Sequence, residues 1–274
     1  HPLVTMLAPL LEDATVPKIV QNAKYEMEVL ACYGVSVKGI AFDTMIAAYC
    51  LDSRQTIGLK DLSERYLTHD MVSFESMMGE YNHILDVPFH ELATYVADDS
   101  NVTFQLYQLF DTQLTGDLRD LFFNVEIPLV SVLSAMELNG VVCDTQHLAK
   151  LSKEYTGVLT ELEQQVHTIS GHAFNLNSPK QLAEVLFDEL KFPVVKKTKT
   201  SRSTDAYVLE VLAKDYDIAA YLLKYRTFQK LVSTYVNKLP ELVHPITQKI
   251  HTSLNQAITA TGRLSSNNPN LQNI

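Results

Sequence analysis

One long apolar stripe, between residues 145 and 170, restricts the fold of this chain more than any other feature. Apolar side chains recur there every three or four positions, at Leu148, Leu151, Tyr155, Leu159, Leu162 and Val166. This spacing is typical of one face of an amphipathic helix. The sequence therefore predicts a long helix that forms half of a helical hairpin.

Further elements are expected after this helix. Capping pairs at Ser178-Pro179 and Thr204-Asp205 predict two short helices, the second over residues 206–212. Another helix is predicted over residues 218–239, where a proline follows it. Residues 251–259 alternate in the manner of a strand. This part of the chain is therefore expected to be mainly helical, with a strand near its end.

The first third of the chain has a different pattern, in which short apolar runs alternate with amphipathic helices. A strand-like run at residues 18–21 precedes a predicted helix over residues 23–33, with Gly34 as its left-handed C-cap. Three more helices are predicted: one that begins after Asp43 as N-cap, one over residues 90–114 and one over residues 123–140. The alternation predicts an α/β layer, with a domain boundary near residue 120.

Length and composition favour two domains in a soluble protein. The chain has 274 residues, and no run approaches the ~18 to 20 uninterrupted apolar residues of a membrane span. The first residues also lack the pattern of a signal peptide. Three cysteines among apolar neighbours are predicted to be reduced core residues: Cys32, Cys50 and Cys143. We expect a cytoplasmic monomer that has no contact with a membrane.

The charge of the chain is unevenly distributed. The net charge is -10, which by itself argues against binding of nucleic acid. Residues 1–189 hold 10 Lys and Arg against 27 Asp and Glu, whereas residues 190–274 hold 12 against 5. The last third therefore carries +7 and is the candidate DNA-binding face.

The most specific motif is the C-terminal run 259–274, which reads TATGRLSSNNPNLQNI. An arginine can donate a bidentate fork to acceptors in the minor groove, and Asn and Gln amides bind without choosing a sequence. The run closely resembles the segment that opens the palm of family A DNA polymerases, the bacterial DNA polymerase I group. By position, this resemblance implies that Arg263 contacts the primer end. It implies further contacts to the primer-template from Asn270, Gln272 and Asn273.

A second motif is the basic run 196–202, in which hydroxyl residues separate the cations. A flexible loop with four cations can clamp phosphates, and the hydroxyl groups can add hydrogen bonds. The run resembles the thumb tip of the same family, and residues 225–235 resemble the helix that follows it. The resemblance implies DNA contacts from six side chains: Lys196, Lys197, Lys199, Arg202, Lys230 and Ser233.

A third motif is divided between residues 22–26, with the sequence NAKYE, and residues 95–99, with the sequence YVADD. The first and last residues of each stretch are four apart, so each pair shares one helix face. A phosphodiester hydrolase that works through two metal ions needs carboxylates for the cations and a group that orients water. The two stretches resemble the second and third motifs of DnaQ-like 3'-to-5' exonucleases.

The resemblance assigns catalytic roles to three residues of these stretches. Asp99 and Glu26 would bind the metal, and Tyr95 would position the attacking water. Asn22 and Lys24 would support the site by contacting DNA. The family has aspartate at the position of Glu26, and a side chain longer by one methylene must retract or shift the metal. Exonuclease activity is therefore an open question.

Together the resemblances imply an α/β, RNase H-like exonuclease portion over residues 1–120. A mainly α thumb and the start of an α+β palm would follow over residues 121–274. The parent protein would extend a primer from dNTPs under two Mg²⁺ ions, with Mn²⁺ as a substitute, and would edit single-stranded 3' ends during DNA replication and repair. The chain opens at His1 and stops at Ile274, directly after the Asn/Gln-rich loop. We therefore expect an inactive piece of a longer protein, with an incomplete metal site.

Two alternatives remain open on the sequence. One is a DNA-binding polymerase whose exonuclease half has decayed into a scaffold, with Glu26 as the trace of that decay. The other is an exonuclease of the ribonuclease D type, which shares the motifs of the first part. The second alternative leaves the basic loop and residues 259–274 unexplained.

Overall fold

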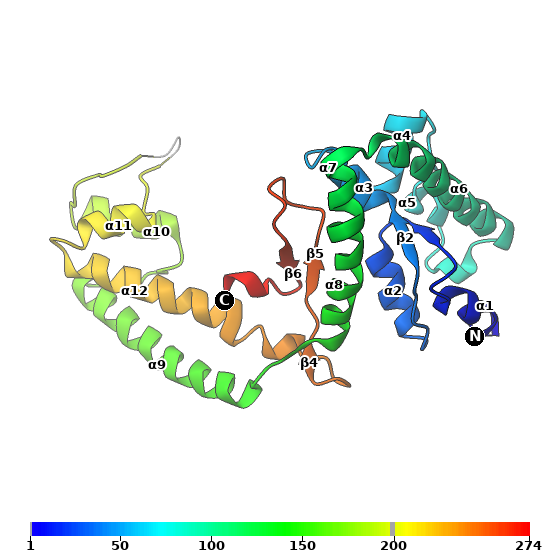
Figure 1. Ribbon diagram of the computed structural model, residues 1–274. Helices are drawn as coiled ribbons and strands as arrows, with labels where there is room; N and C mark the ends of the chain where they lie inside the picture. The colour runs from blue at the N-terminus through cyan, green and yellow to red at the C-terminus, as the bar shows by residue number, and fades with distance from the viewer. Residues whose placement is uncertain (1, 198–200) are drawn as a thin grey trace. The chain divides into compact units, whose positions relative to one another are not determined.

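The computed structural model describes residues 2–197 and 201–274, which form two compact units (Figure 1). The discontinuous unit contains the chain up to Gly140 together with residues 251–274. The inserted unit contains residues 141–250. The discontinuous unit is therefore built from two separate stretches of chain.

The discontinuous unit contains an α/β layer surrounded by helices. Its strands β1 and β2 pair in parallel, and each is followed by a helix, as the alternating sequence pattern predicts. Strands β5 and β6 form an antiparallel pair in the second stretch of chain. The elements of this unit are α1 (Pro2–Glu12), β1 (Lys18–Val20), α2 (Ala23–Ala31), β2 (Ile40–Asp43), α3 (Thr44–Leu51), α4 (Leu59–Leu67), α5 (Phe74–Met78), η1 (Ile84–Asp86), α6 (Phe89–Gln113), α7 (Gly116–Leu121), η2 (Phe122–Glu126), α8 (Ile127–Asn139), β5 (Ser253–Asn255), β6 (Ser265–Asn267) and η6 (Leu271–Asn273).

The turns after β1 and β2 are set by two polar residues. Asn22 has a left-handed backbone conformation, with φ at 61°, and turns the chain from β1 into α2. Asp43 caps α3 as predicted, because its carboxylate accepts hydrogen bonds from the backbone amides of Met45 and Ile46. The predicted left-handed Gly34 is confirmed at φ 78°, although α2 itself ends three residues before it.

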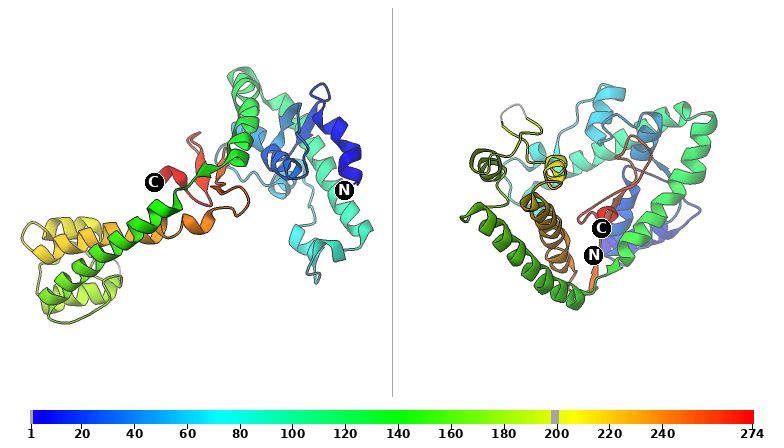
Figure 2. Two further views of the ribbon diagram at one scale, coloured as in Figure 1. Left: turned by 90° about the horizontal axis from the view of Figure 1, so that it is seen from below. Right: turned by 90° about the vertical axis from the view of Figure 1, so that its left-hand side faces the viewer.

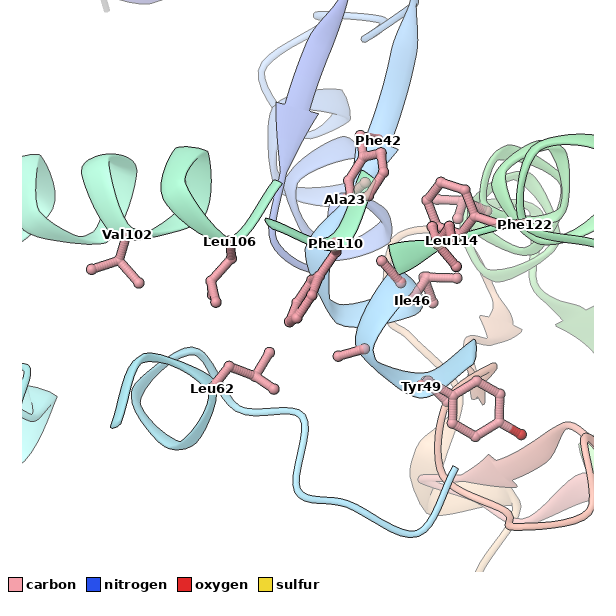
Figure 3. Close-up of a cluster of buried hydrophobic side chains, with 14 of the residues drawn as sticks. Ala23, Phe42, Ile46, Tyr49, Leu62, Val102, Leu106, Phe110, Leu114 and Phe122 are labelled. Carbon is pink, nitrogen blue, oxygen red and sulfur yellow. The ribbon is translucent and has the colours of Figure 1, made fainter. Parts of the chain in front are cut away.

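Aromatic and aliphatic side chains from both stretches of chain form the core of this unit. Figure 3 shows Phe42 from β2 among side chains of α3, α6 and the helical run after α6. The rings of Phe42 and Phe122 lie 4.7 Å apart between centroids. Ala257, which follows β5, is buried in the same cluster. The second stretch of chain therefore completes the core that the first stretch builds.

The helical run 116–139, from α7 through η2 to α8, is long and apolar enough by length and composition to cross a membrane. In the structure three of its apolar side chains, Phe122, Val130 and Leu133, are buried in the protein. Its acidic residues Glu126 and Glu137 accept hydrogen bonds from residues 254–256. The discontinuous unit therefore packs one face of this run into its core, and other apolar side chains of the run stay exposed.

The inserted unit is the predicted helical hairpin. Its long helices α9 and α12 pack along one another, and they lie side by side in both views of Figure 2. All six apolar residues of the predicted stripe on α9 are buried or half-buried. The elements of this unit are β3 (Val141–Val142), α9 (Thr145–Ser170), α10 (Pro179–Ala183), η3 (Glu184–Glu189), α11 (Ala206–Leu212), α12 (Asp217–Leu231), η4 (Val232–Val236), η5 (Pro240–Leu242) and β4 (Lys249–Ile250).

Two elements differ from the sequence-based expectation. The helix predicted over residues 218–239 continues beyond α12 only as the π-helical segment η4 and a turn. The strand predicted over residues 251–259 is limited to the three residues of β5. The chain leaves the strand at Gln256 because this residue and Ala257 are buried against the helices of the same unit.

Candidate functional site

The first candidate site is a cleft of about 620 Å³ in the discontinuous unit, formed mainly by β1, α2 and α6. Glu26 enters it from the first turn of α2, and Asp99 enters it from the middle of α6. The remaining lining is mixed, with five apolar and three polar residues: Ile19, Val20, Gln21, Leu59, Val96, Ser100, Thr103 and Phe104. The fold thus brings together two carboxylates that are distant in sequence.

Both carboxylates of the cleft are easier to protonate than usual. Burial raises the pKa of Asp99, the charge of Asp98 raises it further, and a hydrogen bond from Tyr95 partly offsets both. Partial loss of hydration raises the pKa of Glu26, although its side chain stays exposed at the rim. A divalent cation between these oxygens would favour their ionised forms.

Tyr95 lies beside Asp99 but lines a neighbouring cavity. This second cavity, of about 770 Å³, includes Tyr95, Asp98 and Asp99 among its lining residues. Burial raises the pKa of Tyr95, and the charges of Asp99 and Glu75 raise it further. Asp99 thus faces both cavities, whereas Glu26 faces only the first.

The structure does not bring Asn22 and Lys24 into the cleft. The backbone amide of Asn22 donates to Asp43 Oδ1 at 3.2 Å. The Lys24 ammonium lies 2.5 Å from Glu137 Oε1 on α8 and 3.8 Å from Glu28 Oε1. The DNA contacts expected of Asn22 and Lys24 therefore stay predictions, while the described contacts of both residues are internal.

The donor set of the cleft fits only part of a metal site. Carboxylate oxygens are the ligands that Mg²⁺ and Mn²⁺ prefer. Within residues 2–197 and 201–274, no group of three or more His, Cys, Asp or Glu side chains is arranged to hold a metal ion. Glu26 and Asp99 can therefore supply ligands but do not form a complete site by themselves.

The second candidate site is the basic loop of the inserted unit. Lys196 forms an ion pair with Asp205 at 2.8 Å, and Arg202 donates two hydrogen bonds to Asp188 at 2.6 and 2.5 Å. Hydrogen bonds to Lys196, to the Val208 amide and to Ser203 together lower the pKa of Asp205 to about 2. The Lys196–Asp205 pair is exposed and therefore weak, so a phosphate can compete for Lys196. Lys199 lies outside the described residues.

A cavity of about 880 Å³ adjoins this loop, and its lining includes three cations and two hydroxyl groups beside Pro179, Ala183 and the carboxylate of Glu184. Lys180, Lys197 and Arg202 contribute the cations, and Ser178 and Ser201 contribute hydroxyls. This is the donor chemistry that a phosphate backbone requires. At the end of the loop, Arg226 donates to the carbonyl oxygen of Thr204, which fixes the loop to α12.

Lys230 and Ser233 lie three positions apart at the end of α12 and the start of η4. Both side chains are exposed. Positions three apart share a helix face, so the structure keeps this predicted pair together. Neither residue lines the cavity beside the basic loop.

The third candidate site is the β5–β6 hairpin and the turn after it. Arg263 is exposed in the connection between the strands, where its carbonyl accepts a hydrogen bond from Thr259 Oγ1 at 2.5 Å. Asn270 caps η6 by accepting a hydrogen bond from the Gln272 amide at 3.0 Å. Gln272 Nε2 donates to the carbonyl of Leu264 at 3.1 Å. The structure therefore gathers Arg263, Asn270, Gln272 and Asn273 on one hairpin and the short helix that follows it.

Sequence patterns missed the polar contacts that hold these sites. Asp43 was expected only as a helix cap, yet it also accepts hydrogen bonds from the amides of Asn22 and Ala23. Glu137 and Lys24 are too far apart in sequence for any periodicity to pair them. The one sequence signal for this contact is Glu137 itself, because it is an acidic residue within a mainly apolar helix.

Two protein-family models match the chain. The model for 3'-5' exonucleases matches residues 2–115, and the model for DNA polymerase family A matches residues 145–274. The chain is also similar to curated bacterial proteins. It is 43% identical to DNA polymerase I of Chloroflexus aurantiacus, over 99% of this chain and 30% of that protein. It is 39% identical to DNA polymerase I of Pseudomonas aeruginosa, over 98% of this chain and 30% of that protein. The chain thus spans less than a third of the length of these relatives.

A solved structure has the same fold. The POL domain of Pol1 from M. smegmatis, in complex with DNA primer-template and dNTP, matches with a TM-score of 0.80 and 35% sequence identity. The match covers 98% of this chain and 45% of that one. These matches confirm the predicted order of an α/β exonuclease portion, a helical thumb and the start of a palm. The chain belongs to the family A DNA polymerases and joins a 3'-5' exonuclease segment to a segment of the polymerase domain.

Proposed function

We propose that this chain is part of a DNA-dependent DNA polymerase that extends primers from dNTPs in DNA replication and repair. The observation that carries the proposal is the order of the two family matches on one chain, exonuclease first and polymerase second. The domain boundary would lie near residue 120. We further propose that the protein acts as a cytoplasmic monomer on primer-template DNA.

The hairpin and the basic loop would bind different parts of the DNA. Arg263 would donate to acceptors in the minor groove near the primer end, where a single contact orients the reacting hydroxyl. The cations of residues 196–202 would hold phosphates farther along the duplex, which contributes affinity without sequence preference. Lys230 and Ser233 would extend that phosphate contact along the end of α12.

The exonuclease segment would remove mispaired nucleotides from single-stranded 3' ends. Glu26 and Asp99 would hold a Mg²⁺ or Mn²⁺ ion, which supplies electrostatic stabilisation of the phosphate during hydrolysis. Tyr95 would orient the attacking water from the adjoining cavity. The longer carboxylate of Glu26 favours a second candidate role for this segment, that of a scaffold without cleavage activity.

The polymerase proposal is tested with Arg263→Ala in the full-length protein. The variant should lose primer extension far more than duplex affinity, because many phosphate contacts supply the affinity. Arg65→Ala, which removes another exposed arginine of the same unit, is the matched control. Equal losses of extension and affinity in Arg263→Ala would show that Arg263 is only one more phosphate contact.

A further inference from the structure

The turn before Arg263 is held by a tyrosine of the exonuclease segment. Tyr49 Oη, on α3, donates to the carbonyl of Thr259 at 2.6 Å, and the tyrosine side chain is only 7% exposed. The same carbonyl accepts the amide of Gly262 at 3.3 Å. Thr259 in turn donates its hydroxyl to the carbonyl of Arg263. A chain of hydrogen bonds therefore connects Tyr49 to the backbone of Arg263.

Neighbouring contacts attach the same connection to the exonuclease segment. Ser53 Oγ donates to the carbonyl of Ala260 at 3.2 Å. Gln256 Nε2 donates to the carbonyl of Glu126 at 2.9 Å, and Ala257 is buried in the core. The start of the connection is therefore anchored, and its anchors lie on α3, on the turn after α3 and on η2.

The part of the connection that carries Arg263 has few constraints of its own. Residues 260–263 are all exposed, and Gly262 has a left-handed backbone with φ at 76°. Glycine permits many backbone conformations, so the direction of the next residue depends on the contacts that hold the turn. A side chain that aligns a reacting group must be held within about 0.5 Å by its supporting contacts.

We propose that Tyr49 is a positioning residue for Arg263, and hence that the exonuclease segment supports primer extension without using its own chemistry. The inference rests on the proposed role of Arg263 at the primer end. The Tyr49 hydroxyl fixes the carbonyl of Thr259, and this fixes the turn from which Arg263 reaches the duplex. Loss of that hydroxyl lowers the fraction of molecules in which Arg263 points toward the primer.

The test is Tyr49→Phe in the full-length protein, which removes one hydroxyl and keeps the buried ring. Single-turnover primer extension should slow by about five- to tenfold, as expected for one hydrogen bond, while primer-template affinity changes by less than about twofold. The matched control is Tyr66→Phe, since the Tyr66 hydroxyl donates to Gln55 within the same unit. The control should extend primers at the wild-type rate.

Two further measurements separate positioning from a general loss of structure. Hydrogen exchange of the amides of residues 258–263 should accelerate in Tyr49→Phe and not in Tyr66→Phe. In an Arg263→Ala background, Tyr49→Phe should have almost no additional effect on extension, because its partner in function is already absent. Ser53→Ala removes the hydrogen bond to the carbonyl of Ala260 and should have a smaller effect of the same kind.

Each outcome is decisive. The inference is overturned if Tyr49→Phe extends primers at the wild-type rate. It is also overturned if Tyr49→Phe slows primer extension by the same factor in the wild-type and the Arg263→Ala backgrounds. The role of Arg263 itself is judged separately from Arg263→Ala alone. If that variant lowers affinity and extension equally, the proposed function of Arg263 fails, whatever the exchange data show for Tyr49.

Discussion

The backbone amide of Ala23 donates a 2.6 Å hydrogen bond to Asp43 Oδ2, which joins the start of α2 to the end of β2. Asp43 is 1% exposed, and its other oxygen, Oδ1, accepts the amides of Asn22, Met45 and Ile46. One carboxylate thus fixes both helix starts of the α/β layer. Because α2 carries Glu26, Asp43 also determines where Glu26 meets the cleft.

Removal of this carboxylate should strongly destabilise the discontinuous unit. Asp43→Ala leaves two buried and two half-buried amides without their acceptor, so we expect a loss of about 3 to 5 kcal/mol in the free energy of unfolding. Urea denaturation followed by circular dichroism measures it. Ser73→Ala is the control, because Ser73 caps α5 through one amide and should cost only about 1 kcal/mol. Equal costs for both variants would show that Asp43 is an ordinary cap.

Neutralisation of the basic loop should reduce the salt dependence of DNA binding. Each phosphate contact contributes about 0.9 to the slope of log affinity against log salt. Alanine at Lys196, Lys197, Lys199 and Arg202 together should lower that slope for a primer-template duplex, measured by fluorescence anisotropy. Lys238→Ala is the control, since Lys238 is also an exposed, ion-paired lysine of the inserted unit. An unchanged slope in the fourfold variant would remove the thumb-tip assignment.

Asp99→Ala should abolish removal of a mismatched 3' nucleotide by the full-length protein in Mg²⁺ or Mn²⁺, because it takes away a proposed metal ligand. Asp98→Asn should retain most of this activity, since Asp98 lines only the neighbouring cavity. Gel analysis of the labelled mismatched primer measures both rates.

Glu26→Asp is the sharper test of the exonuclease cleft. The shorter carboxylate should raise the rate if Glu26 is a handicap, and should lower it if α2 is placed to suit the longer side chain. A protein that extends primers but cleaves nothing, with or without Glu26→Asp, would instead support the scaffold role. The catalytic roles of Glu26, Tyr95 and Asp99 would then be wrong.

Glu28 should make the discontinuous unit less stable at high pH. Burial raises the pKa of Glu28 to about 7 from 4.5, Lys24 opposes the shift and Glu137 adds to it. The folded state therefore holds the proton more tightly than the unfolded chain. The contribution of Glu28 to stability is therefore fully present below pH 4.5 and is lost as the pH rises through about 7.

Glu28→Gln should remove this contribution. At pH 8 the variant should be more stable than the wild type by on the order of 1 kcal/mol, because solvent screens part of the effect. At pH 5 the two proteins should differ little. Urea denaturation at both pH values measures the difference, and Glu64→Gln, on the exposed face of α4, is the control. A pH-independent difference would mean that Glu28 does not titrate in this range.

Local patterns predicted most helices because short-range physics determines them. The stripe on α9 and the caps at Asp43, Ser178 and Asp205 act within one or two helical turns, so spacing alone reveals them. The short strand β5 was predicted too long because Ala257 leaves the strand to enter a core that is built by residues more than a hundred positions earlier. No local pattern contains that information.

The candidate sites were predictable to different degrees for the same reason. Tyr95 and Asp99 share one helix, so their proximity follows from a spacing of four. Glu26 and Asp99 line the same cleft only because the tertiary fold places α2 and α6 there, which spacing cannot show. The hydroxyl of Tyr49 has no sequence signal at all, because a buried tyrosine and a tyrosine that donates to a distant carbonyl look alike in sequence.

The division of one compact unit between two stretches of chain has a consequence for synthesis. The ribosome synthesises all of residues 141–250 before it adds Ala257, which packs in the same core cluster as Phe42. Contacts that span so long a segment form slowly, because the intervening chain must first be brought together. The nascent exonuclease segment therefore emerges with an unfilled core, and it reaches its final packing only after the helical hairpin has been translated.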